Sequence, residues 1–163
     1  WRAPERLFAQ LMQVAGRAGR AELPGEVIVQ TQYPDHPLFA ALVAQDYPSF
    51  ASNQLQERAQ AGFPPYTFQA ILRAEAPQMA DALAFLQAAV TLPEAAGQDS
   101  ISIYDPVPMR MARLANLERA QLLVESPSRP ALQQFLPRWR EALEQLRTPR
   151  QLRWHIEVDP LEC

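Results

Sequence analysis

Apolar residues in the first third of the chain recur mainly at helical spacing. In the opening stretch they are separated by three or four residues, at Leu7, Leu11, Val14 and Ala18. This spacing predicts a helix that runs into the sequence QVAGRAGR. The sequence ELPGEVIVQTQ then predicts a turn and a short strand over residues 26–32. Two short helices, interrupted near Pro48, are expected to follow and to end at Gly62.

From about residue 66 the pattern becomes regular. Residues 67–75 alternate and predict a strand, with one apolar face formed by Phe68, Ala70, Leu72 and Ala74. The elements predicted after it are a helix over 77–90, strands over 100–104 and 119–126, a helix over 128–146 and a strand over 152–159. This β-α-β-β-α-β order predicts an α+β, ferredoxin-like domain, in which two helices cover one face of a four-stranded antiparallel sheet.

The second face of that sheet is expected to be open and of mixed polarity. Counting every second position places on it Thr67, Gln69, Ile71, Arg73, Ser102, Tyr104, Arg119, Gln121, Leu123, Arg153, His155 and Glu157. Tyr104 is the one aromatic side chain in this set. The face therefore suits docking against another domain at least as well as stacking of bases.

Composition narrows the class of protein. Of the 163 residues, 48% are hydrophobic, which is enough for a buried core, and no apolar run is long enough to span a membrane. The chain opens without the pattern of a signal peptide, so we expect a soluble protein of the cytoplasm. The single cysteine, Cys163, allows neither an internal disulfide nor a zinc site of the usual spacing, so no metal site is expected.

Charge is distributed unevenly, although the net charge is only −3. Residues 21–105 carry two arginines and ten acidic residues, whereas residues 106–155 carry nine arginines and four acidic residues. The basic segment is a candidate for contact with a polyanion. A merely solvated surface is the alternative.

The sequence QVAGRAGR holds the first candidate site. Each glycine would cost about 1 kcal/mol relative to alanine inside a helix, so a requirement other than helix stability must account for them. Gly16 lets a nucleotide approach the backbone closely, and Gln13 precedes it by three residues. Arg17 and Arg20 present two guanidiniums, which match the charge of a transferring phosphoryl group as arginine fingers do.

The rest of a nucleotide site is missing from this sequence. A phosphate-binding loop of the form GxxxxGK[ST] requires a lysine, and the chain contains none. The two arginines are therefore half of a site, and the other half must lie elsewhere. We expect no ATP hydrolysis and no cofactor in this chain alone.

Several stretches of the sequence resemble a known family. QVAGRAGR is similar to motif VI of superfamily 2 helicases, and it is followed in order by GEVIVQTQYPDHPLF, ERAQAGFPPYTFQAILRAEA, DPVPMRMARL, SPSRPALQQF and WHIEVDP. Together they resemble the C-terminal portion of the PriA family, the primosomal protein N′ helicases of replication restart. The resemblance implies a tail of the second, RecA-like helicase lobe over 1–32, a helical connector over 33–65 and a DNA- and partner-binding domain over 66–163.

The resemblance also implies what the intact parent does. It would be an ATP-dependent 3′-5′ DNA helicase with ATP, Mg²⁺ and structural Zn²⁺, in which this fragment supplies Arg17 and Arg20. Its partners would be branched and single-stranded DNA, the acidic tail of single-stranded-DNA-binding protein and other primosome proteins, with no membrane. The residues that match the family's sites are Arg110, Arg113 and Arg119 for DNA, and Arg129 and Gln133 for the tail.

Other interpretations stay open at this stage. The aromatic residues that relatives carry beside Arg110 and Arg113 are replaced here, which weakens a base-stacking role for this stretch. Arg129 is otherwise interpreted as a solvated arginine in the first turn of a helix capped by Ser128. A free-standing ferredoxin-like interaction module, unrelated to helicases, is the alternative for the whole chain. An intact small enzyme is a weaker one, because no nucleophile, base and orienting group stand together.

Overall fold

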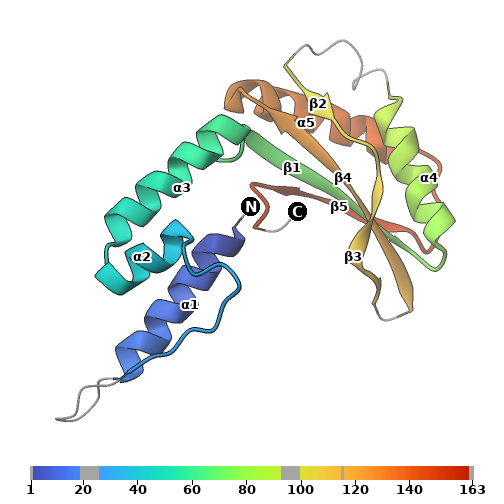
Figure 1. Cartoon of the computed structure of the whole chain (residues 1–163). Helices are drawn as coiled ribbons and strands as arrows, with labels where there is room; N and C mark the ends of the chain where they lie inside the picture. Colours follow the sequence, from blue (N-terminus) through green and yellow to red (C-terminus); the bar gives the residue numbers. More distant parts are fainter. Residues whose placement is uncertain (1, 19–25, 93–99, 115, 162–163) are drawn as a thin grey trace. The chain divides into compact units, whose positions relative to one another are not determined.

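A computed structural model describes the chain except for residues 1, 19–25, 93–99, 115 and 162–163 (Figure 1). The chain divides into two compact units, Trp1–Phe63 and Pro64–Cys163, which we call unit 1 and unit 2. The segment predicted as a lobe tail, 1–32, and residues 33–63 of the predicted connector thus fall within unit 1, and the predicted boundaries at 32 and 65 stay a prediction.

The described part of unit 1 contains three helices, α1 (Ala3–Ala18), α2 (Pro37–Ala44) and α3 (Tyr47–Ala61). Its core is small and is built on the buried side chains of Phe8, Leu38 and Phe50. The rings of Phe8 and Phe50 stack with their centroids 4.2 Å apart. The three helices are those that the apolar spacing predicts.

The face that α1 buries differs from the predicted stripe. Phe8 is buried and Leu11 and Met12 pack against it, whereas Leu7 and Val14 are 41% and 53% exposed. The helix sequence offers two overlapping apolar faces. The face that holds the Phe8 ring is buried because an aromatic ring removes more apolar area from water.

The strand predicted over residues 26–32 is wrong. These residues form neither helix nor strand, and Ile28 is 84% exposed. A strand needs a hydrogen-bonded neighbour, and all strands of the described residues belong to one sheet of unit 2. The alternating sequence is therefore present without the partner that would make it a strand.

Short polar contacts set the ends of α2 and α3. The Nδ1 atom of His36 accepts a hydrogen bond from the Leu38 N–H at 3.1 Å, and the Asp46 carboxylate accepts one from the Ser49 N–H at 3.0 Å. Hydrogen bonds from the Ser49 side chain and backbone lower the pKa of Asp46. Gly62 ends α3 in the left-handed conformation, with φ +66°. Pro48 lies in the first turn of α3, where proline is tolerated.

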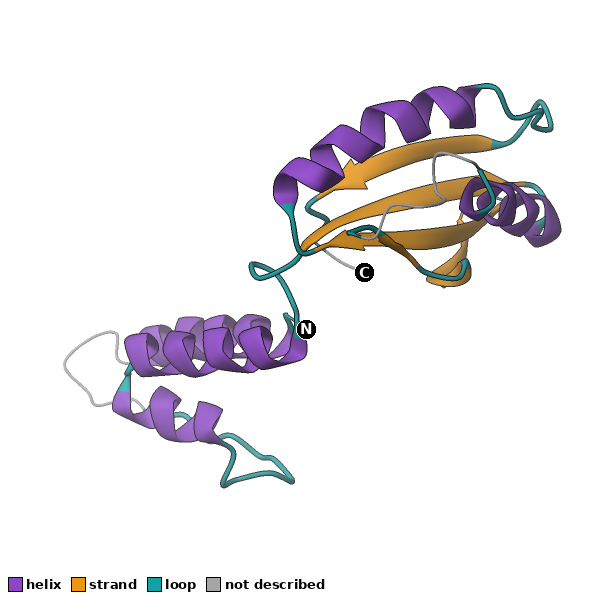
Figure 2. Ribbon diagram, turned by 90° about the horizontal axis from the view of Figure 1, so that it is seen from above, coloured by secondary structure: helices purple, strands orange, loops and turns teal. Residues whose placement is uncertain are grey.

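Unit 2 is an antiparallel sheet covered by two helices (Figures 1 and 2). In chain order it contains β1 (Phe68–Ala76), α4 (Met79–Val90), β2 (Ser102–Ile103), β3 (Val107–Leu114), β4 (Leu117–Ser126), α5 (Arg129–Glu144) and β5 (Arg153–Val158). The strands lie in the order β2-β4-β1-β5, and β3 also pairs with β4. If β2 and β3 are taken as one interrupted strand, this is the predicted ferredoxin-like fold.

The interrupted strand is the main departure from the prediction. Strand β3 was not predicted, so the sheet formed by the described residues has five strands rather than four. Its pairing with β4 shifts between Pro108 and Arg113, whose partners are Ala120 and Glu118. Residues 109–112 therefore lie opposite Arg119 alone, as an enlarged bulge. A bulge breaks the period of two on which strand prediction depends.

The core of unit 2 lies between the sheet and its helices. The predicted apolar face of β1 is confirmed, since Ala70, Leu72 and Ala74 are all buried there. Trp139 of α5 is fully buried, and its Nε1–H donates a hydrogen bond to the Ala89 carbonyl at 3.1 Å. This contact ties the two helices together across the core.

Candidate nucleotide, nucleic-acid and partner sites

The residues of the QVAGRAGR motif lie on the last part of α1. Gln13, Gly16 and Arg17 are all exposed, and Arg17 lies in the last turn of the helix. Arg20 lies outside the described residues. A Cβ atom added at Gly16 would meet nothing within 4 Å, so no packing in the described part of the chain requires a glycine there. The guanidinium of Arg17 is available to a group outside this chain.

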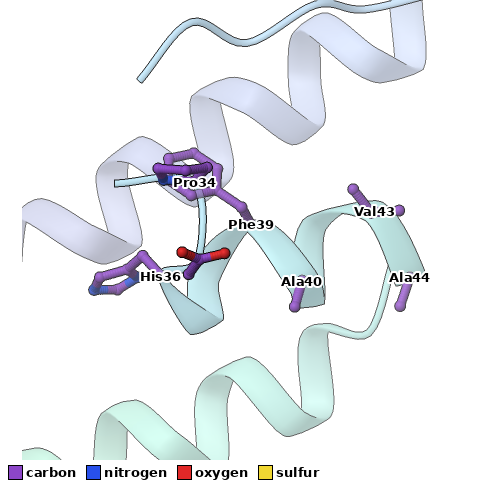
Figure 3. A pocket seen from close by; sticks show the side chains of 7 residues that line it. Pro34, His36, Phe39, Ala40, Val43 and Ala44 are labelled. Atoms are coloured by element: carbon purple, nitrogen blue, oxygen red, sulfur yellow. The ribbon is translucent and has the colours of Figure 1, made fainter. Parts of the chain in front are cut away.

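Unit 1 also contains a hollow, which is separate from the motif of α1. It has a volume of about 630 Å³ and is lined by Pro34, Asp35, His36, Phe39, Ala40, Val43 and Ala44 (Figure 3). Its lining is mainly apolar and contains an acidic residue but no arginine. A phosphate group would find no guanidinium there, so the hollow does not complete the motif of α1.

The three arginines predicted to contact DNA are in two different environments. Arg110 is exposed on the bulge of β3, and the Arg113 side chain is 68% exposed with Glu118 at 3.7 Å. Arg119 is only 16% exposed, and its Nε donates to the Glu75 carboxylate at 2.9 Å. Arg110 and Arg113 therefore point to solvent from the β3–β4 hairpin, while Arg119 is occupied within the sheet.

The second face of the sheet carries the residues that were predicted for it, but it is only partly open, because Ile71 and Gln69 are buried. The register sets Ile71 opposite Leu123 and Glu157, and Arg73 opposite Gln121 and His155. Two of its three arginines are compensated locally, since Arg73 pairs with Glu157 at 2.8 Å and Arg119 pairs with Glu75 at 2.9 Å, while Arg153 is exposed. Such a face attracts phosphate less than a run of uncompensated arginines would.

A second polar group on this face is centred on Glu125. Its carboxylate accepts hydrogen bonds from Thr67 and Gln69 at 2.9 Å and from the Tyr104 hydroxyl at 2.8 Å. The hydrogen bond to Glu125 raises the pKa of Tyr104, because the hydroxyl must keep its proton in order to donate that bond. Tyr104 is thereby held in place by the sheet, although it is 47% exposed.

Arg129 is the first residue of α5, and the predicted helix cap is present beside it. The Ser128 side chain accepts a hydrogen bond from the Ala131 N–H at 3.3 Å. The guanidinium carbon of Arg129 lies 4.9 Å from the centroid of the Phe68 ring. Gln133 is exposed one turn further along the helix, on the same side as Arg129.

An acidic residue that sequence reasoning did not connect with Arg129 lies beside it. The Arg129 Nη2 atom is 3.6 Å from the Asp159 Oδ2 atom, and both side chains are more than half exposed. Phe68 and Asp159 are 91 residues apart in the sequence but meet at one corner of the sheet, because β1 and β5 are antiparallel neighbours. The alternation of β1 marked Phe68 only as a core position, and nothing in the sequence paired Asp159 with Arg129.

In the described part of the chain, no group of three or more His, Cys, Asp or Glu side chains is placed to hold a metal ion. None of the helices described is both long enough and apolar enough to cross a membrane.

Comparison with known proteins assigns the chain to a family. It belongs to the family described as the primosomal protein N C-terminal domain, whose model matches residues 59–161. The relatives named "Replication restart protein PriA" include that of Haemophilus influenzae, which is 40% identical over 98% of this chain and 22% of its own length. Those of Synechocystis sp. and Treponema pallidum are 36% and 35% identical, each over 99% of this chain. The chain spans about a fifth of the length of the curated relatives that it matches.

The share of the chain that these matches cover bears on the alternative of an interaction module unrelated to helicases. Because 98% of the chain aligns with the Haemophilus influenzae relative, helix α1 and its motif are part of the similarity. A module unrelated to this family is therefore not supported. Among solved structures, the de novo designed protein Foldit4 covers 58% of this chain and 97% of its own, with a TM-score of 0.42 and 5% identity.

Proposed function

We propose that this chain is the C-terminal part of an ATP-dependent DNA helicase that restarts replication in the cytoplasm by assembling a primosome on branched DNA. The observation that carries the proposal is the similarity along nearly the whole chain to relatives named replication restart protein PriA. The exposed Arg17 on α1 is consistent with a residue that acts on a nucleotide held by another part of such a protein. ATP, Mg²⁺ and structural Zn²⁺ would then belong to that other part.

The arginine-finger role is tested by measuring ATP hydrolysis by the chain alone and by the whole helicase. The chain alone should not hydrolyse ATP, with or without DNA, because it has no phosphate loop. In the whole helicase, Arg17→Ala or Arg20→Ala should slow hydrolysis by about 10³-fold, because each removes charge stabilisation from the transition state, and DNA binding should be unchanged. Measurable DNA-stimulated turnover by the chain alone, or equal loss of hydrolysis and DNA binding in the variants, would contradict this role.

DNA binding by unit 2 is proposed to use the β3–β4 hairpin. Arg110 and Arg113 are exposed there, although Glu118 lies 3.7 Å from Arg113, whereas Arg73 and Arg119 on the open sheet face are largely buried and paired with glutamates. Contacts made by guanidiniums to phosphates depend little on base sequence and weaken steeply with salt. We therefore expect weak, salt-sensitive binding of a branched DNA that carries a single-stranded arm.

A matched pair of double variants tests the hairpin. Arg110→Ala with Arg113→Ala should reduce the slope of log affinity against log salt by about 2, which is the loss of two phosphate contacts. Arg147→Ala with Arg150→Ala removes the same charge from an exposed segment after α5 and should change the slope little. Equal effects of the two pairs would mean that net charge, rather than the hairpin, attracts DNA.

Arg129 and Gln133 are proposed to receive the acidic C-terminal tail of single-stranded-DNA-binding protein. Both are exposed on one side of the start of α5, where a guanidinium and an amide can bind a terminal carboxylate and the backbone next to it. Binding to this chain alone should be at the millimolar end, because other parts of the parent would complete the pocket. A tail peptide should shift the amide NMR signals of residues 128–134, and Arg129→Ala should abolish those shifts.

A further inference from the structure

The guanidinium of Arg129 lies between two groups of unit 2. On one side is the ring of Phe68, 4.9 Å from the guanidinium carbon, which is within the range of a cation–π contact. On the other side is the Asp159 carboxylate, at 3.6 Å from Nη2. That separation is longer than the 2.7–2.9 Å of a charge-assisted hydrogen bond. The guanidinium can therefore form a shorter contact with another carboxylate than it has with Asp159.

The backbone holds Asp159 at this place. Its N–H donates a hydrogen bond to the Gln69 carbonyl at 2.9 Å, directly after β5 ends at Val158. Its φ is +52°, in the left-handed region that aspartate and asparagine adopt more readily than other non-glycine residues. The chain turns at this residue, so its backbone is held at the sheet corner and its exposed carboxylate lies within reach of Arg129.

We propose that Asp159 is an internal competitor for the Arg129 site, so that a partner's carboxylate must displace it in order to bind. The proposal deepens the tail-binding role given above and rests on it. Asp159 occupies the guanidinium when no partner is present, and Phe68 keeps the guanidinium at the corner when Asp159 leaves. Because both charged side chains are more than half exposed, the internal pair is weak and can be displaced.

Competition from Asp159 should lower the affinity for a partner by a measurable factor. Exposed ion pairs contribute about 0.2–1 kcal/mol. Arg129 is therefore free of Asp159 for only part of the time, and the apparent affinity for a partner is lower by about two- to fivefold. Removing the charge of Asp159 should recover that factor.

The test uses the substitution Asp159→Asn in the full chain. Asparagine has nearly the same shape and is compatible with φ +52°, so it removes the charge and leaves the turn intact. The control is Glu141→Gln, which removes one negative charge from an exposed position of the same helix as Arg129. Binding of a synthetic tail peptide of single-stranded-DNA-binding protein is measured by NMR titration, and the same peptide with a C-terminal amide is titrated in parallel.

The outcomes separate this inference from the function on which it rests. The inference is supported if Asp159→Asn tightens binding of the free-acid peptide by about two- to fivefold while Glu141→Gln does not. It is overturned, with the tail-binding role intact, if Asp159→Asn binds as the unsubstituted chain does and Arg129→Ala abolishes binding. It is also overturned if Glu141→Gln tightens binding equally. If neither the unsubstituted chain nor Asp159→Asn binds the peptide at any concentration, the tail-binding role fails and the inference fails with it.

Discussion

At the scale of single residues, Trp139 stabilises unit 2 through a hydrogen bond as well as through burial of its apolar area. Its indole ring is fully buried and stacks on Phe135 at a centroid distance of 5.3 Å. Its N–H also satisfies the Ala89 carbonyl, which is among the last carbonyls of α4 and has no partner within that helix. The residue therefore caps one helix from within another.

Trp139→Phe should destabilise unit 2 by about 2–3 kcal/mol. The substitution leaves a cavity and a buried carbonyl without a donor, and both effects lower the free energy of unfolding. Urea denaturation of the full chain, followed through amide signals of unit 2, measures the change. Trp154→Phe is the control, since Trp154 is only partly buried and phenylalanine can keep its stacking on Phe85, and it should cost less than about 1.5 kcal/mol. Equal losses in the two variants would show that the indole N–H contributes nothing particular.

At the scale of helices, replacing each of the two described glycines by alanine should have opposite effects on stability. Gly16 lies within α1, and a Cβ atom added there would meet nothing within 4 Å, so Gly16→Ala should stabilise α1 by about 0.5–1 kcal/mol. Gly62 has φ +66° at the end of α3, so Gly62→Ala should cost about 1 kcal/mol through backbone conformation. Hydrogen exchange of the α1 and α3 amides measures both effects.

The first of these substitutions has a second use in the whole helicase. If Gly16 serves nucleotide approach, Gly16→Ala should impair ATP hydrolysis although it stabilises the helix. A variant with a stabilised helix and full hydrolysis would leave the glycine without a functional role. The comparison distinguishes the effect of Gly16 on helix stability from its effect on nucleotide approach.

The cap of α3 gives unit 1 a dependence on pH. The pKa of Asp46 is lowered by the hydrogen bonds from Ser49, so its contribution to stability is complete above the ordinary aspartate pKa and is lost as pH falls through the lowered value. Hydrogen exchange or circular dichroism below pH 4 should show loosening of α3 in the unsubstituted chain. Asp46→Asn keeps an N-cap side chain without this titration, so its α3 should not show the same loss. An identical acid profile in both chains would mean that other carboxylates dominate.

The elements that the sequence predicted are those whose neighbours lie in the described chain. The periods of β1, α4, β4, α5 and β5 agree with the structure, because each of these elements buries one face against another of them. Residues 26–32 show the same kind of alternation but have no strand beside them, and they stay irregular. Strand β3 was missed because Pro108 and a bulge interrupt its pattern.

The candidate sites were only partly accessible to sequence reasoning for a similar reason. Resemblance located Arg119 and Arg129, but not the acidic residues that the structure sets beside them. Glu75 pairs with Arg119 through the register of β1 and β4, and Asp159 reaches Arg129 through the neighbouring strands β1 and β5. Such pairs depend on tertiary register, which a single sequence does not contain.

At the scale of the whole molecule, the two units differ greatly in the cores they bury. The described core of unit 1 rests on three buried apolar side chains, whereas that of unit 2 contains 17 buried residues. No residue belongs to both clusters. Since burial of apolar area supplies most of the stability of a domain, unit 1 should be the less stable of the two.

We therefore expect the full chain to unfold in two steps. Amide signals of α1 and α3 should disappear at a lower urea concentration than those of β1 and β4, because the smaller core offsets less of the conformational entropy of the chain. Trp139→Phe should move the second step to lower urea and leave the first unchanged, since Trp139 belongs to the core of unit 2 alone. A single transition that Trp139→Phe shifts for all four elements together would show instead that the two units unfold as one cooperative body.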